Sequence, residues 1–360
     1  MIDLDSGAFA EMPTGVTVLI CTYNGAATIA ETLACLARQQ VPAGVDWEVI
    51  LVDNASTDGT AERAQEQWDD LGAPVPLRVL REPRPGKQHA VEVGVRAVRY
   101  RYACIVDDDN RLLPNYLATG LALLEKHPRI GILGGRNTAT FEAPEPEWFS
   151  DFQARYAVGP QRDWTSEGRE LSEGNVGQNV LWGAGMFVRT AIWKRLQAIN
   201  FQSLFSGRQG EENLTAGEDD ELCYLCLFMG YEVWYSPSLQ LRHYMTAGRL
   251  TTAYRDQLFY GATHAMGRLG AYRNALWGKA SADAGNNFIK DLLYSATGLI
   301  RGVCTLPFLK SLLKGNAIDV MNKKYVFYQI KELTLNAKKT KEYYRQAAAT
   351  KEKLAPGCPA

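Results

Sequence analysis

Residues 103–109, which read ACIVDDD, decide the fold: a short apolar run ends directly in three carboxylates. Two earlier apolar runs, Val16–Cys21 (VTVLIC) and Val49–Val52 (VILV), also end in polar residues. Between the first two runs, Ile29, Leu33 and Leu36 recur at helical spacing. Strands that alternate with helices predict βαβ units, and thus a mostly parallel sheet with helices on both faces.

The same patterns place the remaining elements along the chain. We expect a helix at 61–68, a strand at 77–80, a helix bearing Val91, Val95 and Val98, a helix ending near Lys126 with Pro114 in its first turn, and a strand at 130–133. Residues 141–180 are rich in Glu, Pro, Gly and Trp and predict long loops, which are usually functional in a compact domain. Regular structure is expected again from Gly183–Val188. A helix at Glu218–Met229, a strand at Tyr231–Tyr235 and helices to the end are expected to follow.

Polar residues follow three of the predicted strands where those strands end. They are Thr22, Tyr23 and Asn24 after the first strand, Asp53 after the second, and Asp107, Asp108 and Asp109 after the strand at 103–106. In an open α/β sheet, ligands bind beyond the carboxyl ends of the strands. These side chains are therefore expected to face one crevice.

The three adjacent aspartates repel one another, and a divalent cation would stabilise them. Asp107 and Asp109 are expected on one side of the extended chain, with Asp108 on the other. Oxygen ligands of this kind suit Mg²⁺ or Mn²⁺. The alternative is a solvated acidic turn near a helix N-terminus. Lys87, in Pro85-Gly86-Lys87, brings a cation to a phosphate or is an ordinary surface lysine.

Three further positions have both a chemical and a structural interpretation. Glu218-Asp219-Asp220-Glu221 either presents a general base after a glycine-bearing loop or forms an ordinary acidic helix start. His243 completes a metal site or is a structural histidine. Cys223 and Cys226 have the CxxC spacing, but they lie in an apolar helical run and are expected to be buried free thiols.

Composition excludes several classes of protein. The 360 residues are 46% hydrophobic and 22% charged, which excludes disordered and fibrous chains. No secretory signal and no run of about 18 apolar residues is visible, and seven cysteines do not form a disulfide scaffold. A reducing, cytoplasmic compartment is expected.

The motifs, taken in order, resemble those of the inverting family 2 glycosyltransferases with the GT-A fold. The matching segments are residues 18–24 (VLICTYN), 52–59 (VDNASTDG), 86–90 (GKQHA), 107–109 (DDD) and 217–219 (GED), with the downstream His243. Asp53-Asn54 stands where Asp-Asp is commoner, and Val91-Glu92 where many members have an Asn. The resemblance implies a Rossmann-like, mostly parallel sheet flanked by helices over residues 14–245, with a helical C-terminal extension over 246–360.

The resemblance also implies roles for individual residues. Thr22, Tyr23 and Asn24 would line the nucleotide pocket, and Asp53 would bind the base. Asp107 and Asp109 would contact the ribose and the metal-bound diphosphate, with Asp108 and Lys87 also on the donor side. Gly183-Ala184-Gly185 would flank the donor sugar and the acceptor. Asp219 would be the catalytic base, with Glu218 as the alternative, and Asp109 and His243 would hold Mn²⁺ or Mg²⁺.

The expected function is inverting, metal-dependent transfer of a sugar, of the hexosyl type, from a nucleotide-diphosphate sugar to a hydroxyl of a saccharide acceptor. Two alternatives are a non-catalytic nucleotide-sugar-binding scaffold and a sugar nucleotidyltransferase. The nucleotidyltransferase should carry a glycine-rich loop after the first strand, which Asn24-Gly25-Ala26-Ala27 is not. No nucleic acid partner is expected.

Charge is divided unequally along the chain. Residues 1–240 carry 20 basic and 33 acidic groups, a balance of −13, whereas residues 241–360 carry 19 and 7, a balance of +12. Residues 286–315 mix apolar residues with Lys and Arg, which is typical of an amphipathic interfacial helix. Residues 286–341 are therefore expected either to bind the anionic inner face of the cell membrane, with a polyprenyl-linked acceptor, or to pack on the catalytic domain.

Overall fold

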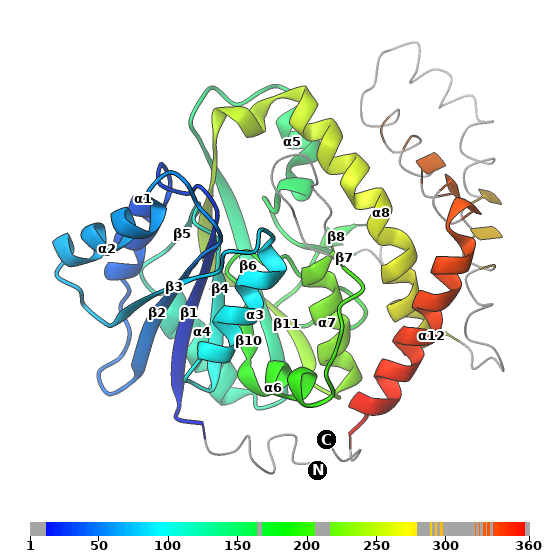
Figure 1. Cartoon of the computed structure of the whole chain (residues 1–360), viewed down its shortest axis with the longest axis horizontal. Coiled ribbons are helices and arrows are strands. Elements are labelled where there is room, and N and C mark those ends of the chain that lie inside the picture. The colour runs from blue at the N-terminus through cyan, green and yellow to red at the C-terminus, as the bar shows by residue number, and fades with distance from the viewer. Residues whose placement is uncertain are drawn as a thin grey trace.

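One nine-stranded sheet forms the centre of the protein (Figure 1). The computed structural model describes residues 12–163, 168–205, 217–278 and 334–356, with single positions between 289 and 331. The strand order is β3-β2-β1-β4-β10-β6-β11-β5, and β9 pairs with β11. The strands are β1 (Gly15–Thr22), β2 (Asp46–Asp53), β3 (Leu77–Arg81), β4 (Tyr102–Val106), β5 (Asn110–Leu112), β6 (Ile130–Phe141), β9 (Gly174–Asn175), β10 (Phe187–Arg189) and β11 (Glu232–Met245).

The sheet is mostly parallel, as the sequence predicts. β3, β2, β1 and β4 are parallel neighbours, and β6 is parallel to β11. The short strands β10, β5 and β9 pair antiparallel with their neighbours. Since β1, β2 and β4 run in the same direction, the residues that follow them meet at one edge of the sheet.

Helices cover both faces of the sheet, which confirms the predicted layers (Figure 1). On one face, Val18 and Ile20 of β1 lie in a core cluster with apolar side chains of three helices. These helices are α1 (Ile29–Ala37), α2 (Thr60–Asp70) and α4 (Tyr116–Lys126). On the opposite face lie α3 (Lys87–Ala97), α6 (Thr190–Ala198) and α7 (Glu218–Phe228). Alternate residues of β1 thus enter different core clusters, as strand periodicity requires.

Two details of the predicted helices are wrong. α4 begins at Tyr116 after the N-cap Asn115, so that Pro114 precedes the helix rather than lying in its first turn. The buried residues of α3 itself are Ala90 and Gly94, whereas only part of the predicted stripe is in the core: Val98 is buried just after the helix and Val95 packs against the core at its side. The reason is space: a Cβ on Gly94 would lie 2.3 Å from Leu19 Cδ1, and only a glycine lets α3 approach the sheet this closely.

The segment predicted as long loops contains short ordered elements. These are α5 (Phe149–Phe152), the 3-10 helix η1 (Gln153–Tyr156) and the strand pair β7 (Arg162–Asp163) and β8 (Arg169–Glu170). Phe149, Phe152 and Tyr156 are buried in one aromatic cluster with Phe259. Packing of aromatic side chains therefore orders this segment without any regular periodicity in its sequence.

β11 is much longer than the strand predicted at Tyr231–Tyr235. It pairs with β6 from Glu232 to Met245, with a register shift between Tyr235 and Gln240. Ser236-Pro237-Ser238 lies at this shift and has the composition of a turn, which is why the sequence pattern ends the strand too early. The extension matters because it carries His243 to the carboxyl end of the sheet.

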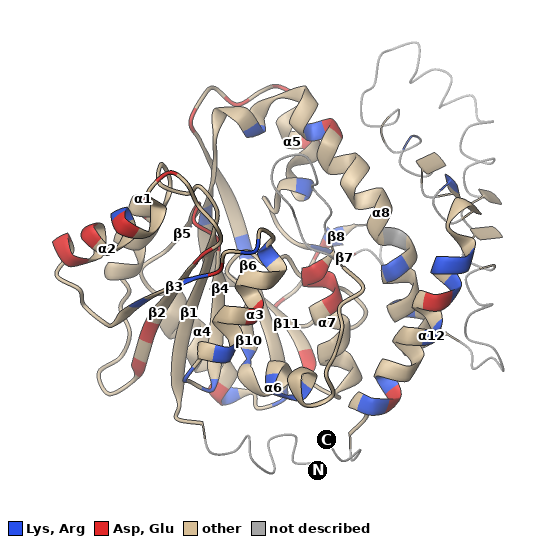
Figure 2. Cartoon of the chain, in the orientation of Figure 1, with Lys and Arg blue, Asp and Glu red and all other residues tan. Residues whose placement is uncertain are grey.

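Two long helices of the C-terminal region pack against α7, on one face of the sheet. α8 (Thr252–Trp277) and α12 (Ala337–Leu354) contribute Tyr272, Tyr344 and Leu354 to the same cluster as the side chains of α7. α12 carries two glutamates and six basic residues, and its ribbon is blue at basic positions in Figure 2: Lys338, Lys339, Lys341, Arg345, Lys351 and Lys353. The interfacial helix predicted at 286–315 lies, except for isolated positions, outside the described residues. Among the helices that are described, none is long and apolar enough to cross a membrane.

Glu221 of α7 joins three parts of this face. Its carboxylate accepts hydrogen bonds from Ser203 Oγ, from the backbone N–H of Leu204 at 2.9 Å, and from Tyr272 Oη of α8 at 2.7 Å. Its side chain is buried, and burial raises its pKa to about 7, although the bonds from Ser203 and Tyr272 oppose this. A buried carboxyl thus holds α8 and the loop at 201–205 against the helix that begins with Glu218 and Asp219.

This raised pKa makes stability depend on pH. An unfolded glutamate has a pKa of about 4.3, so the folded state binds the Glu221 proton more tightly between that value and about 7. The stabilisation is complete at low pH and is lost as the pH rises through this window. We expect Glu221→Gln to remove roughly 1–3 kcal/mol of this decline in the free energy of unfolding. Urea unfolding at several pH values from 5 to 7.5 measures the free energy of unfolding of wild type and of Glu221→Gln, with Glu66→Gln, at an exposed position, as the control. If the free energy of unfolding of wild type and of Glu221→Gln changed with pH in parallel, this role of Glu221 would be contradicted.

Candidate active site

The turns that follow β1 and β2 are bonded into one rim. The backbone N–H of Asn24 donates to Ser56 Oγ at 2.9 Å, and Asn24 Oδ1 accepts from the backbone N–H of Thr57 at 2.9 Å. Asp53 Oδ1 accepts from the backbone N–H of Ser56 at 3.1 Å. Tyr23 lies on this rim with half of its surface exposed. The structure thus brings Tyr23, Asn24 and Asp53 together, and an exposed aromatic ring there suits stacking on a base.

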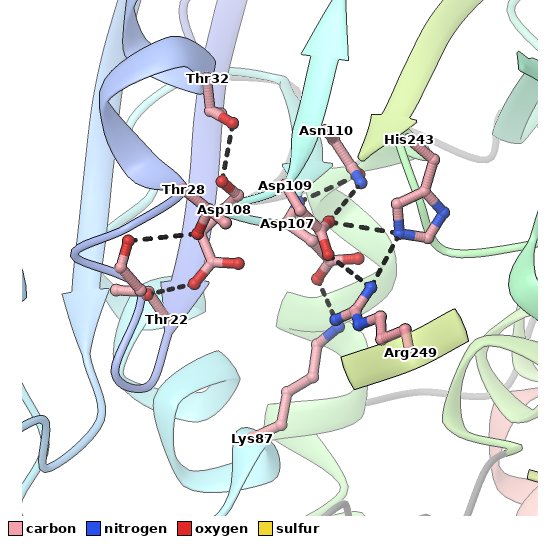
Figure 3. A network of polar contacts seen from close by, with 11 residues as sticks. Thr22, Thr28, Thr32, Lys87, Asp107, Asp108, Asp109, Asn110, His243 and Arg249 are labelled. Atoms are coloured by element: carbon pink, nitrogen blue, oxygen red, sulfur yellow. Dashed lines mark hydrogen bonds and ion pairs between the residues drawn. The ribbon is translucent and has the colours of Figure 1, made fainter. Parts of the chain in front are cut away.

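The three aspartates form a tight turn between β4 and β5. The backbone N–H of Asn110 donates to the Asp107 carbonyl at 3.0 Å, and Asn110 Oδ1 accepts from the backbone N–H of Asp107 at 3.1 Å. Figure 3 shows the side chains of Asp107 and Asp109 on one side and that of Asp108 directed toward Thr22. This confirms the predicted alternation, and we call residues 107–110 the acid turn.

Asp108 is held under the turn that follows β1. Thr22 Oγ1 donates to its carboxylate, and Thr32 Oγ1 donates to its backbone carbonyl at 2.8 Å. Gly25 leaves the necessary space, because a Cβ at this position would lie 2.2 Å from Asp108 Oδ2. Burial and the neighbouring Asp109 raise the pKa of Asp108 to about 7, against the effect of Thr22. Asp108 thus connects the β1 and β4 ends of the site.

Asp107 pairs with Lys87, the first residue of α3. The Nζ–Oδ1 distance is 2.7 Å, and Gly86, with φ of +129°, turns the chain into the helix. Burial tends to raise the pKa of Asp107, but the Lys87 ammonium outweighs it and holds this pKa below its usual value. The sequence-predicted lysine therefore does lie among the strand ends.

Asp109 faces the His243 imidazole carried by β11 and the Arg249 guanidinium carried by the turn after it. β5 pairs with β11 so that His243 lies opposite Asn110, and this places His243 Nε2 3.3 Å from Asp109 Oδ1. Arg249, in the 3-10 turn η2 (Ala247–Leu250), lies with one guanidinium nitrogen 2.6 Å from Asp109 Oδ2. The sequence reasoning missed Arg249. The sequence does contain one indication of such a residue: three adjacent aspartates require more positive charge than Lys87 alone supplies.

The acid turn offers donors that fit a hard divalent cation. Asp107 and Asp109 present carboxylate oxygens on one side, and Nε2 of His243 faces them, 3.3 Å from Asp109 Oδ1 and 3.3 Å from an Arg249 guanidinium nitrogen. Within the described ranges, however, no three His, Cys, Asp or Glu side chains converge on one point. The position beside Asp109 Oδ2 is taken by Arg249. The chemistry of the donors suits Mn²⁺ or Mg²⁺, but this arrangement is closed by a side-chain cation.

Asp219 lies in the first turn of α7, after the N-cap Gly217 and next to Glu218. Its Oδ2 accepts a hydrogen bond from the backbone N–H of Gly183 at 2.9 Å. A Cβ on Gly183 would lie 2.3 Å from Asp219 Oδ1, so that this close approach requires a glycine. The predicted base is thereby joined to the segment expected beside the donor sugar. Which of Asp219 and Glu218 is the base stays a prediction.

Gly185 and the two cysteines of α7 have structural explanations. Gly185 has φ of +74°, its carbonyl accepts a hydrogen bond from Tyr116 Oη at 2.7 Å, and a Cβ would lie 2.3 Å from that oxygen. Packing thus accounts for this glycine, and its contact with the donor stays a prediction. Cys223 and Cys226 are buried free thiols, as expected.

The hydrogen bonds of the Asn54 side chain explain why an asparagine stands where an Asp-Asp pair is commoner. Its Nδ2 donates to the carbonyls of Glu82 at 3.2 Å and Arg84 at 2.7 Å, and its Oδ1 accepts from the backbone N–H of Gly86 at 2.8 Å. An aspartate has no donor for the two carbonyls. Asn54 therefore fixes the segment that delivers Lys87 to the acid turn.

Comparison with known proteins identifies the class. Residues 17–193, about half of the chain, match the model of glycosyl transferase family 2, and this segment is a domain of that family. A chondroitin synthase of Escherichia coli is 31% identical over 124 residues, which are 34% of this chain and 17% of the relative. The poly(ribitol-phosphate) β-N-acetylglucosaminyltransferase TarS of Staphylococcus aureus is 28% identical over 111 residues, 31% of this chain and 19% of the relative. The match therefore spans less than a fifth of the length of either relative.

A solved structure shares the fold over nearly the whole chain. The mannosyltransferase from Pyrobaculum calidifontis, in complex with GDP-mannose and Mn²⁺, superposes with a TM-score of 0.51 at 18% identity, covering 95% of this chain and 88% of that one. This likeness confirms the expected GT-A architecture.

The role of Asn54 is tested by Asn54→Asp. We expect a loss of about 1–3 kcal/mol in the free energy of unfolding, because a carboxylate oxygen would face the carbonyls of Glu82 and Arg84 without a proton to share. Urea denaturation at pH 7 measures the loss. The matched control is Asn115→Asp at the exposed N-cap of α4, where added negative charge is favourable. Equal stability of the two variants would contradict the role of Asn54.

Proposed function

We propose that this chain is an inverting, metal-dependent glycosyltransferase that moves a sugar from a nucleotide-diphosphate sugar to a hydroxyl of a saccharide or lipid-linked saccharide. The observation that carries the proposal is the acid turn at the carboxyl end of a parallel sheet, with Lys87, His243 and Arg249 around it. Membership of family 2 and the mannosyltransferase complex with GDP-mannose and Mn²⁺ support it.

The chain's own residues divide the work of donor binding. Tyr23, Asn24 and Asp53 hold the base and ribose on the rim formed by the β1 and β2 turns. Lys87 lies beside Asp107, where a cation can approach phosphate oxygens. Asp109 and His243 would hold Mn²⁺ or Mg²⁺, and the metal would supply Lewis-acid stabilisation of the leaving diphosphate.

The acceptor hydroxyl needs a base on the side of the sugar opposite the diphosphate. Asp219 fills this role in the proposal, because it lies in the first turn of α7 and its Oδ2 is oriented by the Gly183 N–H. Glu218 is the alternative base. Synthesis of a polysaccharide or surface glycan is the biological setting that the chondroitin synthase and TarS relatives support.

The base assignment is tested by Asp219→Asn beside Glu218→Gln. With the nucleotide sugar that gives turnover in a donor panel, we expect Asp219→Asn to lower kcat by roughly 10²–10⁴-fold, while KM for the donor changes little. Glu218→Gln is expected to keep most of the activity. Release of nucleoside diphosphate, followed with Mn²⁺, Mg²⁺ or EDTA, measures both variants, and NMR of the product reports its anomeric configuration.

Each alternative gives a different result. Full turnover by Asp219→Asn with loss in Glu218→Gln assigns the base to Glu218. Donor binding without turnover by the wild type, for every donor and a panel of saccharide acceptors, favours the scaffold. Release of pyrophosphate from a nucleoside triphosphate and a sugar phosphate identifies a nucleotidyltransferase.

A further inference from the structure

The carboxylate of Asp109 is fully engaged in this structure. Oδ1 accepts from Asn110 Nδ2 at 2.9 Å and lies 3.3 Å from His243 Nε2, while Oδ2 lies 2.6 Å from the Arg249 guanidinium (Figure 3). The Asp109 side chain is only 4% exposed, whereas that of Arg249 is 30% exposed. Arg249 therefore occupies Oδ2 of the carboxylate proposed to hold the metal.

The acid turn already contains balancing charges. Lys87 and Arg249 face Asp107 and Asp109, one cation for each carboxylate. The pKa of Asp109 is held low by Arg249 and then by His243, against the effect of burial. A divalent cation entering this arrangement would meet two fixed positive charges, and like charges at such short range repel strongly. Metal binding at Asp109 thus requires that Arg249 leave it.

Arg249 is placed so that its side chain can leave. It belongs to the short turn η2 between β11 and α8, and this turn is held through its backbone: Ala247 N–H donates to Glu142 Oε2 at 2.6 Å, and Arg249 N–H donates to the Thr246 carbonyl at 2.9 Å. The guanidinium can therefore change partner without unfolding the turn. Guanidinium groups bind phosphate oxygens in a planar, bidentate manner.

We propose that Arg249 exchanges partners during donor binding: it neutralises Asp109 in the free protein, and it moves to the diphosphate when a divalent cation and a nucleoside diphosphate enter together. The proposal rests on the metal and donor sites of the proposed function. Its consequence is that Arg249 couples the two ligands. It weakens binding of the metal alone and strengthens binding of metal and nucleotide together.

The test measures Mn²⁺ binding rather than activity. The full chain is titrated with Mn²⁺, and free Mn²⁺ is followed by electron paramagnetic resonance, alone and with UDP or GDP. Arg249→Met removes the competing charge and keeps much of the side-chain length, so we expect Mn²⁺ alone to bind about tenfold more tightly than to wild type, a coupling of ordinary size. The gain in Mn²⁺ affinity on adding the nucleotide is expected to be smaller than in wild type.

Two variants separate this exchange from a general charge effect. Arg242→Met removes the same charge from an exposed position next to His243 and is expected to bind Mn²⁺ like wild type. Arg249→Lys keeps the charge and is expected to stay within a few-fold of wild type. The proposal would be overturned if Arg249→Met bound Mn²⁺ with the affinity of wild type, or if it did not bind Mn²⁺ at all. An equal rise of Mn²⁺ affinity in Arg242→Met would also overturn it.

The outcomes also distinguish this exchange from the proposed function. If Arg249→Met tightens Mn²⁺ binding while no nucleotide sugar is turned over, the exchange stands and sugar transfer falls. If sugar transfer occurs with Mn²⁺ and Arg249→Met leaves Mn²⁺ affinity unchanged, the transfer stands and the exchange falls.

Discussion

Neutralisation of the buried Asp109 carboxylate is the constraint on which the rest of the site depends. Three adjacent aspartates cannot all stay ionised at the end of an apolar strand unless positive groups surround them. The fold brings two cations from distant segments, Lys87 from the start of α3 and Arg249 from the turn after β11, and it places the imidazole of His243 beside Asp109. The length of β11 and its pairing with β5 thus have an electrostatic as well as an architectural role.

Much of this arrangement can be predicted from the sequence. Apolar runs that end in polar residues identify β1, β2 and β4, and parallel strands necessarily bring Thr22, Asp53 and the acid turn to one edge. The alternation of side chains along an extended chain places Asp107 and Asp109 together, as observed. These predictions succeed because they depend on local pattern and on the direction of strands, which the sequence contains.

The remainder depends on contacts between segments far apart in the chain. β5 has only three residues, and β11 continues past Ser236-Pro237-Ser238, so neither extent is visible as a local pattern. Arg249 is one of many basic residues beyond position 240, and only the fold shows which of them meets Asp109. Asn54 reads as a departure from a motif until its bonds to the segment before Lys87 are seen.

The central claim is that the acid turn binds the diphosphate of a nucleotide sugar through a divalent cation. Calorimetric titration of wild type and Asp109→Asn with UDP, GDP, dTDP and ADP, each with Mn²⁺, tests it most directly. The account predicts that at least one nucleotide binds to wild type in a Mn²⁺-dependent manner and that Asp109→Asn loses this binding. Nucleotide binding of equal strength in both proteins, or in wild type with EDTA in place of Mn²⁺, would contradict it.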